Sequence, residues 1–248
     1  LSVLIFLRVF QPIFLNQASG PFAAGILWAV GITSGYFAIK HLGITRALGI
    51  WIPVVIIVSA LWGLIFFGEA QLLGQEKLIQ TIFAIGLLVI AALAIIFSSK
   101  GEEKLGKVKI GILAAITLGV FHGSFFVPLR ASDLSIFVTF VPLTFGMVIT
   151  TTLIILFKKL KPFSNLFNLS RMILAGLILD GGNYTALLTI QFLGVAQGYP
   201  LAQLAIIVNT LWGTLVFKEA TTTRSKIFIG LGITIAIIGA VLLNSARV

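Results

Sequence analysis

Two stretches of the chain decide the fold: residues 56–69, IIVSALWGLIFFGE, and residues 206–219, IIVNTLWGTLVFKE. At an offset of 150 positions they are identical at 8 of 14 positions. The identical pairs include Trp62 and Trp212, Gly63 and Gly213, and Glu69 and Glu219. Apolar composition alone does not align Trp, Gly and Glu. An offset of 151 extends the match upstream to Gly43 and Gly194, so the chain contains an internal duplication.

The composition identifies a membrane protein. Of the 248 residues 59% are hydrophobic and 10% are charged, against about 25% charged in soluble domains. The mean hydropathy is +1.15. The chain has no Cys, which excludes disulfides and thiol catalysis. The net charge of +10 is interpreted as membrane orientation by basic loops, and we expect no nucleic-acid partner.

Nine apolar segments follow one another along the chain. They cover residues 1–7, 20–40, 46–67, 78–98, 107–129, 136–157, 169–190, 197–217 and 226–244. Each complete segment is long enough to cross a hydrocarbon core of about 30 Å as an α-helix. The first is too short to span, and we expect that part of the protein precedes it.

The duplication predicts an all-α integral membrane protein with an inverted repeat of five plus five helices. Residue 1 corresponds to Thr151, so the equivalents of residues 107–150 are absent. We expect ten transmembrane helices in the intact protein and about nine here, the first one partial. Residues 1–99 form the first repeat, without its first helix and part of the second, and 100–248 form the second repeat. An odd number of helices inverts the second repeat, an architecture typical of secondary transporters.

Basic residues predict the orientation. Thirteen of the 17 Lys and Arg residues fall on one side of the predicted helices: Lys40, Arg46, Lys100, Lys104, Lys107, Lys109, Lys158, Lys159, Lys161, Arg171, Lys218, Arg224 and Lys226. Positively charged loops stay in the cytoplasm. We therefore expect a multi-pass protein of the plasma membrane with its C-terminus outside the cytoplasm.

Asp180 is the one acid well inside a predicted span. Asn183 and Tyr184 lie within about 60° of it around a helix of 3.6 residues per turn. Ionisable groups inside a membrane normally face a cavity or a partner, and sugars are bound by carboxylates, amides and aromatic rings. We expect these three residues to bind substrate and Asp180 to exchange the coupling proton. The alternative is a structural carboxylate bonded between helices.

Further substrate-binding candidates lie on other predicted spans: Tyr199, Gln203, Trp28 and Tyr36. The Trp and Tyr residues have an alternative interpretation as markers of the membrane interface. The Gln197 and Gln203 amides, with Asn183, favour a hydroxylated substrate. His122 lies beside the close-packing motif Gly119-x-x-x-Gly123, where it serves either as a proton relay or as a packing residue.

Two features are assigned outside the substrate site. Glu69 ends its predicted helix and is expected at the membrane interface or paired with Lys77. The last helix of each half, 78–98 and 226–244, is almost without polar residues, so we expect it to face lipid or a second copy of the chain in a homodimer.

Each half resembles the drug/metabolite transporter superfamily, through the pattern LWG-x-x-x-F-x-E. Residues 123–130, GSFFVPLR, are similar to the G-S-x-F-x-P-x-K stretch of its glucose/ribose porter family, and residues 197–203, QGYPLAQ, resemble its sugar-uptake branch. This resemblance implies ten helices, secondary transport and sugar uptake coupled to protons.

The expected function is import of a small sugar by proton symport with alternating access. The alternative is export of amino acids or drug-like metabolites. Two His and one buried Asp are too few for an intramembrane enzyme. We expect no cofactor and no metal.

Overall fold

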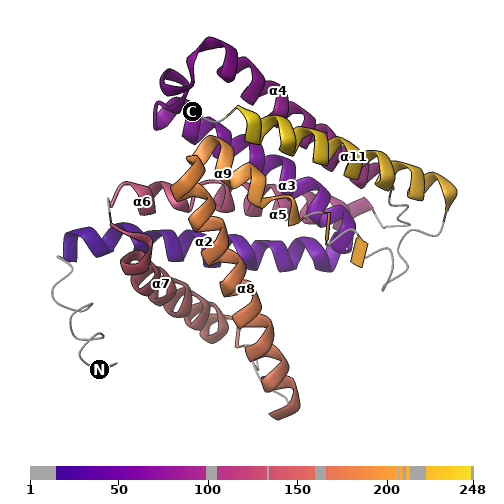
Figure 1. Cartoon of the computed structure of the whole chain (residues 1–248). Coiled ribbons are helices and arrows are strands. Elements are labelled where there is room, and N and C mark those ends of the chain that lie inside the picture. Colours follow the sequence, from indigo (N-terminus) through magenta and orange to yellow (C-terminus); the bar gives the residue numbers. More distant parts are fainter. Residues whose placement is uncertain are drawn as a thin grey trace. The chain divides into compact units, whose positions relative to one another are not determined.

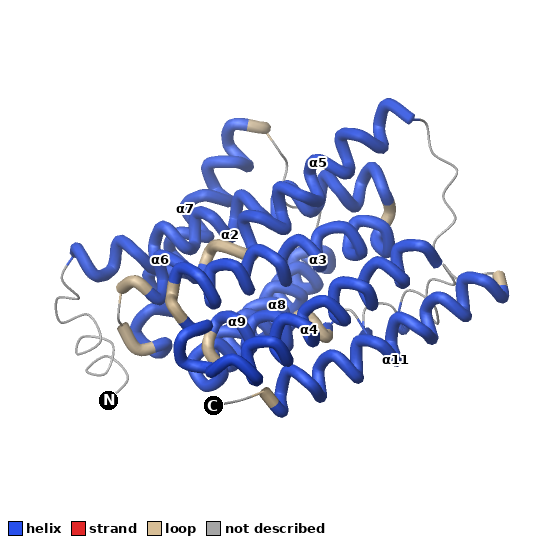
Figure 2. Tube along the Cα trace, turned by 90° about the horizontal axis from the view of Figure 1, so that it is seen from above, coloured by secondary structure: helices blue, strands red, loops and turns tan. Residues whose placement is uncertain are grey.

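The structure is a computed structural model that describes residues 15–98, 105–132, 134–159, 166–205, 207–208, 211–212 and 222–246. Every secondary-structure element in these ranges is a helix (Figure 2). The elements are α2 (Leu15–Leu42), α3 (Ile44–Leu61), the π-helical turn η1 (Trp62–Phe66), α4 (Glu69–Ser98), α5 (Leu105–His122), α6 (Phe126–Arg130), α7 (Ile136–Phe157), α8 (Leu166–Leu193), α9 (Val195–Ala202) and α11 (Thr223–Ser245).

Seven helices of the described residues are long and apolar enough to cross a membrane. They cover Gln17–Leu42, Ala47–Phe66, Glu69–Ile95, Val108–Arg130, Val138–Phe157, Phe167–Leu193 and Thr223–Ser245. Seven of the nine predicted segments coincide with them, which confirms the all-helical, multi-pass class. The partial segment 1–7, most of 203–217 and Glu219 lie outside the described residues.

The structure adds a break inside one predicted span and moves the start of another. The segment predicted as one helix over 107–129 ends at His122 and resumes as α6, because the chain turns at Gly123–Phe125. Pro128 is tolerated in the first turn of α6, where a missing N–H costs no helical bond. The helix predicted to begin at 78 begins at Glu69, with a kink at Gly74, whose φ of 70° suits glycine.

The chain forms two compact units, each described by itself. The first contains the described residues of Leu1–Val30 and Phe125–Leu188, and the second contains those of Gly31–Ser124 and Thr189–Val248. In the first unit α2 and α7 cross through Gly25 and Gly146. A Cβ built on Gly25 would lie 2.9 Å from Gly146 Cα, so only glycine lets the two backbones approach this closely.

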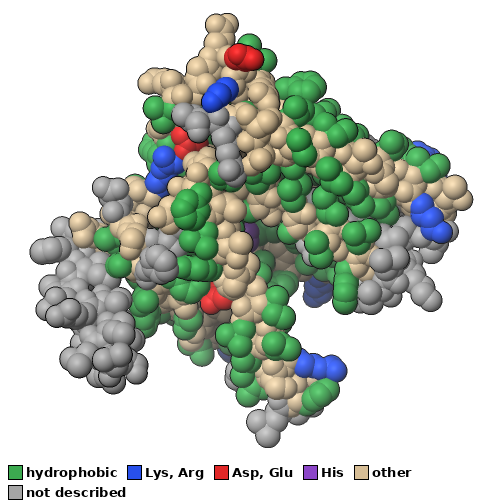
Figure 3. Space-filling model, in the orientation of Figure 1, with side chains coloured by type: hydrophobic (Ala, Val, Ile, Leu, Met, Phe, Trp, Pro, Cys, Tyr) green, Lys and Arg blue, Asp and Glu red, His purple; other side chains and the backbone are tan. Residues whose placement is uncertain are grey.

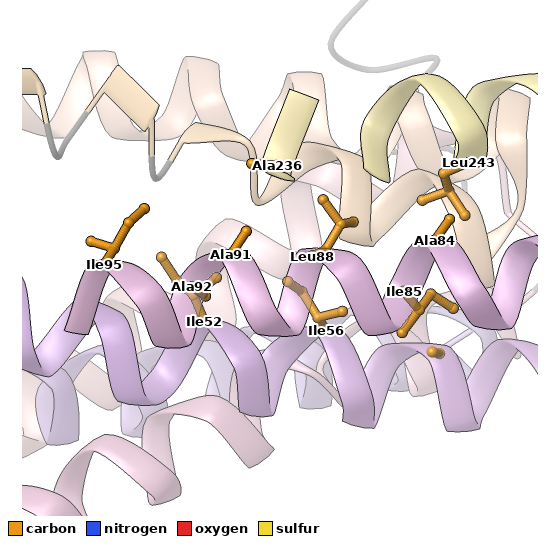
Figure 4. Close-up of a cluster of buried hydrophobic side chains, with 11 residues drawn as sticks. Ile52, Ile56, Ala84, Ile85, Leu88, Ala91, Ala92, Ile95, Ala236 and Leu243 are labelled. Carbon is orange, nitrogen blue, oxygen red and sulfur yellow. The ribbon is translucent and has the colours of Figure 1, made fainter. Parts of the chain in front are cut away.

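The second unit has its core between α3, α4 and α11, which lie side by side in both views (Figures 1 and 2). Figure 4 shows that α4 lies between α3 and α11 and packs side chains against both. Ala84, Leu88 and Ala91 face α11, while Ile85 and Ala92 face α3. Small residues on α4 therefore allow close packing on two sides of one helix.

α4 and α11 run antiparallel. On α11, Gly232 packs against Ala91 and Ile95, whereas Gly239, further along, packs against the earlier residue Ala84. Gln80 extends the series, since its Nε2 donates to Leu242 O at 3.1 Å. Large apolar side chains cover the outer sides of both helices (Figure 3). They are Ile79, Ile82, Phe83, Ile90 and Leu93 on α4, and Ile227, Leu231, Ile237, Ile238 and Val241 on α11.

The backbone repeats at the offset found in the sequence. α2 and α8 each have 28 residues, and they begin and end 151 positions apart. Each is followed by a glycine in the same unusual conformation, with φ 77° and ψ 170° at Gly43 and φ 76° and ψ 175° at Gly194. Both glycines start the next helix, so the sharp corner between the two helices is duplicated along with the sequence.

Candidate functional site

The polar residues predicted on α8 lie on its inner side. Asp180, Asn183 and Tyr184 are half-buried, while the intervening Gly181 and Gly182 are exposed. This pattern follows from helical geometry, because residues three and four apart share a face. The first unit therefore presents a carboxylate, an amide and a phenol within about one turn of helix.

Tyr184 is held against α7 by an aromatic contact. Its ring and that of Phe140 lie edge to face, with centroids 5.6 Å apart and an interplanar angle of 87°. Such pairs contribute about 0.5–1.5 kcal/mol beyond the area they bury. The contact fixes the orientation of the tyrosine on α8.

The side-chain amide nitrogen of Asn183 is buried and finds no hydrogen-bond partner among the described residues. A buried donor left unsatisfied costs about 1–3 kcal/mol. Such a group is retained where a bound molecule or water accepts its hydrogen bond. Asn183 is therefore the residue of this face that most directly indicates a polar ligand.

The other predicted site residues are divided between the two units. Trp28, 8% exposed, belongs to the first unit, on α2 one turn beyond the Gly25 crossing. The second unit contains Tyr36, 62% exposed, and Tyr199, 5% exposed. Gln203 is half-buried at the C-cap of α9. Tyr36 thus lies on the surface of its unit and Tyr199 in the interior of its own.

His122 packs at the end of α5 against α2. A Cβ built on Gly31 would lie 2.7 Å from His122 Cδ2, so the glycine provides the space that the ring occupies. The neighbouring motif packs as predicted, since a Cβ on Gly123 would lie 2.7 Å from Val58 Cβ on α3. Both glycines of the motif, Gly119 within α5 and Gly123 directly after it, thus pack closely against α3.

Two of the sequence motifs meet in a contact that sequence reasoning missed. Trp62 Nε1 donates to Ser124 Oγ at 2.9 Å, which joins the LWG motif to the GS motif. Trp62 begins the π-helical turn η1, a conformation frequent at functional sites. The sequence shows both motifs, but neither motif contains a pattern that predicts a contact between Trp62 and Ser124.

Gln197 does not support the argument for a hydroxylated substrate. The residue is 4% exposed, and its Nε2 donates to Thr81 Oγ1 on α4 and to Ala246 O, both at 3.2 Å. These bonds use both amide hydrogens. The side chain therefore joins α9 to its neighbours.

Glu69 makes a contact that the sequence did not predict. It is 8% exposed at the start of α4, and its carboxylate accepts hydrogen bonds from the first two backbone amides of α9. Glu69 is thus a buried residue at a helix junction within the second unit.

Seven apolar helices among the described residues, packed through small residues at their crossings, indicate an integral membrane protein. The half-buried carboxylate and amide of α8 are polar groups of the kind that transporters place inside the membrane. The chain belongs to the family described as "Sugar transport protein", whose family model matches residues 2–246. It is therefore a transport protein and not an enzyme.

Individual relatives agree with the family. The chain is 30% identical over 229 residues to the "Probable glucose uptake protein GlcU" of Priestia megaterium, which covers 90% of this chain and 78% of that protein. It is 26% identical over 227 residues to the "Glucose uptake protein GlcU" of Bacillus subtilis (strain 168), covering 90% and 77%. The similarity thus extends over most of both chains.

Proposed function

We propose that this protein imports a sugar across the cell membrane by proton symport. The family and the relatives named for glucose uptake support a sugar as the substrate. The observation that carries the proposal in the structure is the buried amide of Asn183, a donor without an acceptor among the described residues, on the same face as Asp180.

The chemistry of this face suits a pyranose. Each sugar hydroxyl both donates and accepts a hydrogen bond. The Asp180 carboxylate accepts from one hydroxyl, the Asn183 amide donates to another, and the Tyr184 ring offers an apolar face to the C–H surface of the sugar. Trp28 on α2, in the same unit, is proposed to add an aromatic ring to this lining. Tyr36, Tyr199 and Gln203 stay proposed substrate-binding residues of the second unit.

Proton coupling is assigned to Asp180 in the first unit, and His122 is proposed separately as a proton-relay residue of the second unit. A carboxylate that is charged in one state and neutral in another changes the cost of moving the site through the apolar bilayer. Proton symport results if the protein can switch the side of the membrane to which the site is open only when Asp180 is protonated and sugar is bound.

The proposed architecture is an inverted repeat of five plus five helices that works by alternating access. The antiparallel packing of α4 and α11 supports it, because these helices occupy corresponding places in the two halves of the sequence. The matching corners at Gly43 and Gly194 give further support. The C-terminus is proposed to lie outside the cytoplasm, from the distribution of basic residues.

Radiolabelled glucose uptake into proteoliposomes tests this function. With one pH unit across the membrane, coupling of one proton to one sugar concentrates glucose about tenfold. Asp180→Asn keeps the shape and removes the titration, so accumulation should vanish while exchange of glucose across the membrane survives. Glu76→Gln, at an exposed acid on α4, is the control and should accumulate glucose normally. Accumulation by the Asn variant against a gradient would show that Asp180 does not couple the proton.

A further inference from the structure

The Glu69 carboxylate holds the beginning of α9 on the beginning of α4. Its Oε1 accepts from Val195 N–H at 2.9 Å, and its Oε2 accepts from Ala196 N–H at 2.8 Å. The first amides of a helix have no acceptor within the helix, and a negative charge there is favourable. One side chain therefore satisfies two of these amides with both of its oxygens, 126 and 127 residues away in sequence.

Two glycines shape the corner around this carboxylate. Gly194, which precedes α9, has φ 76°, and a Cβ built there would lie 3.0 Å from Glu69 Oε1. Gly63, in η1, packs against the same turn, since a Cβ on it would lie 2.8 Å from Ala196 Cα. Larger residues at either position would push α9 away from the carboxylate.

A second attachment lies one residue further along α9. Gln197 donates to Thr81 on α4, a little more than three turns from Glu69. α9 is therefore attached to α4 both at its N-terminal amides and through a side chain. It is a short helix of eight residues that begins at a sharp corner, so its position depends on such attachments.

We propose that Glu69 is a positioning residue of the transport cycle, whose carboxylate fastens α9 to α4 so that the two helices move as one body. The inference rests on the proposed transport function for the motion, while the attachment itself is independent of the substrate. Charged acceptors form stronger hydrogen bonds than neutral ones. A Gln side chain has one acceptor oxygen, and its NH2 would face the second amide as donor against donor.

Hydrogen exchange of the purified full chain, without sugar, measures the attachment. In Glu69→Gln the amides of Val195 and Ala196 should exchange at least about tenfold faster than in the wild type, because a hydrogen bond to a charged group is lost. Glu76→Gln removes an exposed acid from the same helix and should leave their exchange unchanged. If the Gln variant does not fold, Glu69→Asp is used in its place. Asp keeps the charge, but its shorter side chain should not reach both amides, so faster exchange of Val195 and Ala196 is again expected. Unchanged exchange in a folded variant overturns the proposal.

Distance measurement tests whether α4 and α9 move together. The chain has no Cys, so spin labels at Leu72→Cys on α4 and Ala202→Cys at the end of α9 report on one pair of sites. Leu72 is exposed and Ala202 is half-buried. One narrow distance, the same with and without glucose, is expected, and Glu69→Gln should broaden it. A distance that changes with glucose while Glu69 is intact overturns the single-body proposal.

Transport kinetics separate a positioning role from a role in folding alone. Per folded molecule, Glu69→Gln should lower the maximal glucose uptake rate about tenfold, matching the expected change in exchange, and should leave KM within about twofold. The KM should change little because the substitution does not alter the residues of α8 that are proposed to bind sugar. A normal uptake rate despite faster exchange would make Glu69 purely structural and refute the proposal. A wild type that moves no glucose would refute the proposed function, whereas exchange and distances would still decide whether the attachment exists.

Discussion

Replacing Gln197 by Leu tests whether this amide joins helices or binds sugar. The Gln197 side chain is 4% exposed and donates to Thr81 Oγ1 and Ala246 O. Leu has a similar volume but donates nothing. A hydrogen bond between membrane helices contributes about 0.6 kcal/mol on average, and an acceptor left buried without a donor costs about 1–3 kcal/mol. We expect a total loss of about 2 kcal/mol.

The loss is measured by thermal unfolding of the purified protein in detergent, followed by Trp fluorescence. About 2 kcal/mol corresponds to a Tm lower by roughly 4–8 °C in a chain of this size. Adding Thr81→Val should recover part of the loss, because replacing both partners of a buried bond by apolar groups can be nearly neutral. Gln191→Leu, at an exposed Gln of α8, is the matched control and should leave Tm unchanged within about 1 °C.

The same variant is then assayed for glucose uptake. The KM of the folded Gln197→Leu protein should stay within about twofold of the wild type, a free-energy change below about 0.5 kcal/mol. A KM raised tenfold with an unchanged Tm would refute this reasoning and show that Gln197 binds sugar.

Two further predictions concern the motif contact and the topology. Trp62→Phe and Ser124→Ala each remove the 2.9 Å hydrogen bond, so each should lower Tm by a few degrees, and the double variant should lower it by less than the sum of the two; an additive loss in thermal unfolding would show that the bond contributes nothing. A C-terminal alkaline phosphatase fusion should be active and a fluorescent-protein fusion dark, because thirteen of 17 basic residues flank the opposite face; the reverse pattern would invert the proposed orientation.

The helices could be predicted from the sequence because their cause is local. A run of about 20 apolar residues is sufficient to indicate a span, and the segments 20–40 and 136–157 agree with α2 and α7. The break after His122 was missed because the apolar run continues through the turn. Gly123 and Pro128 were the available signals, but glycine and proline are also frequent inside membrane helices.

The roles of Glu69 and Gln197 could not be predicted because their partners are distant in sequence. Glu69 bonds to amides 126 and 127 residues away, and Gln197 to a hydroxyl 116 residues away. Backbone amides carry no sequence signal, since every residue except proline has one. Asn183 differs, because its polar stripe on α8 depends only on helical periodicity, and the structure places it half-buried beside Asp180.

The pairing of α4 with α11 has a consequence for synthesis in the cell. Gln80 finds its acceptor Leu242 O only after 162 further residues, which takes a ribosome roughly 8–30 s at about 5–20 residues per second. During that interval α11 has not yet been synthesised, so the amide of Gln80 and the small-residue side of α4 lack their packing partner. A chain that ends before Thr223 lacks α11 and therefore lacks one side of the core of the second unit. We expect membrane proteases to degrade such truncated chains first.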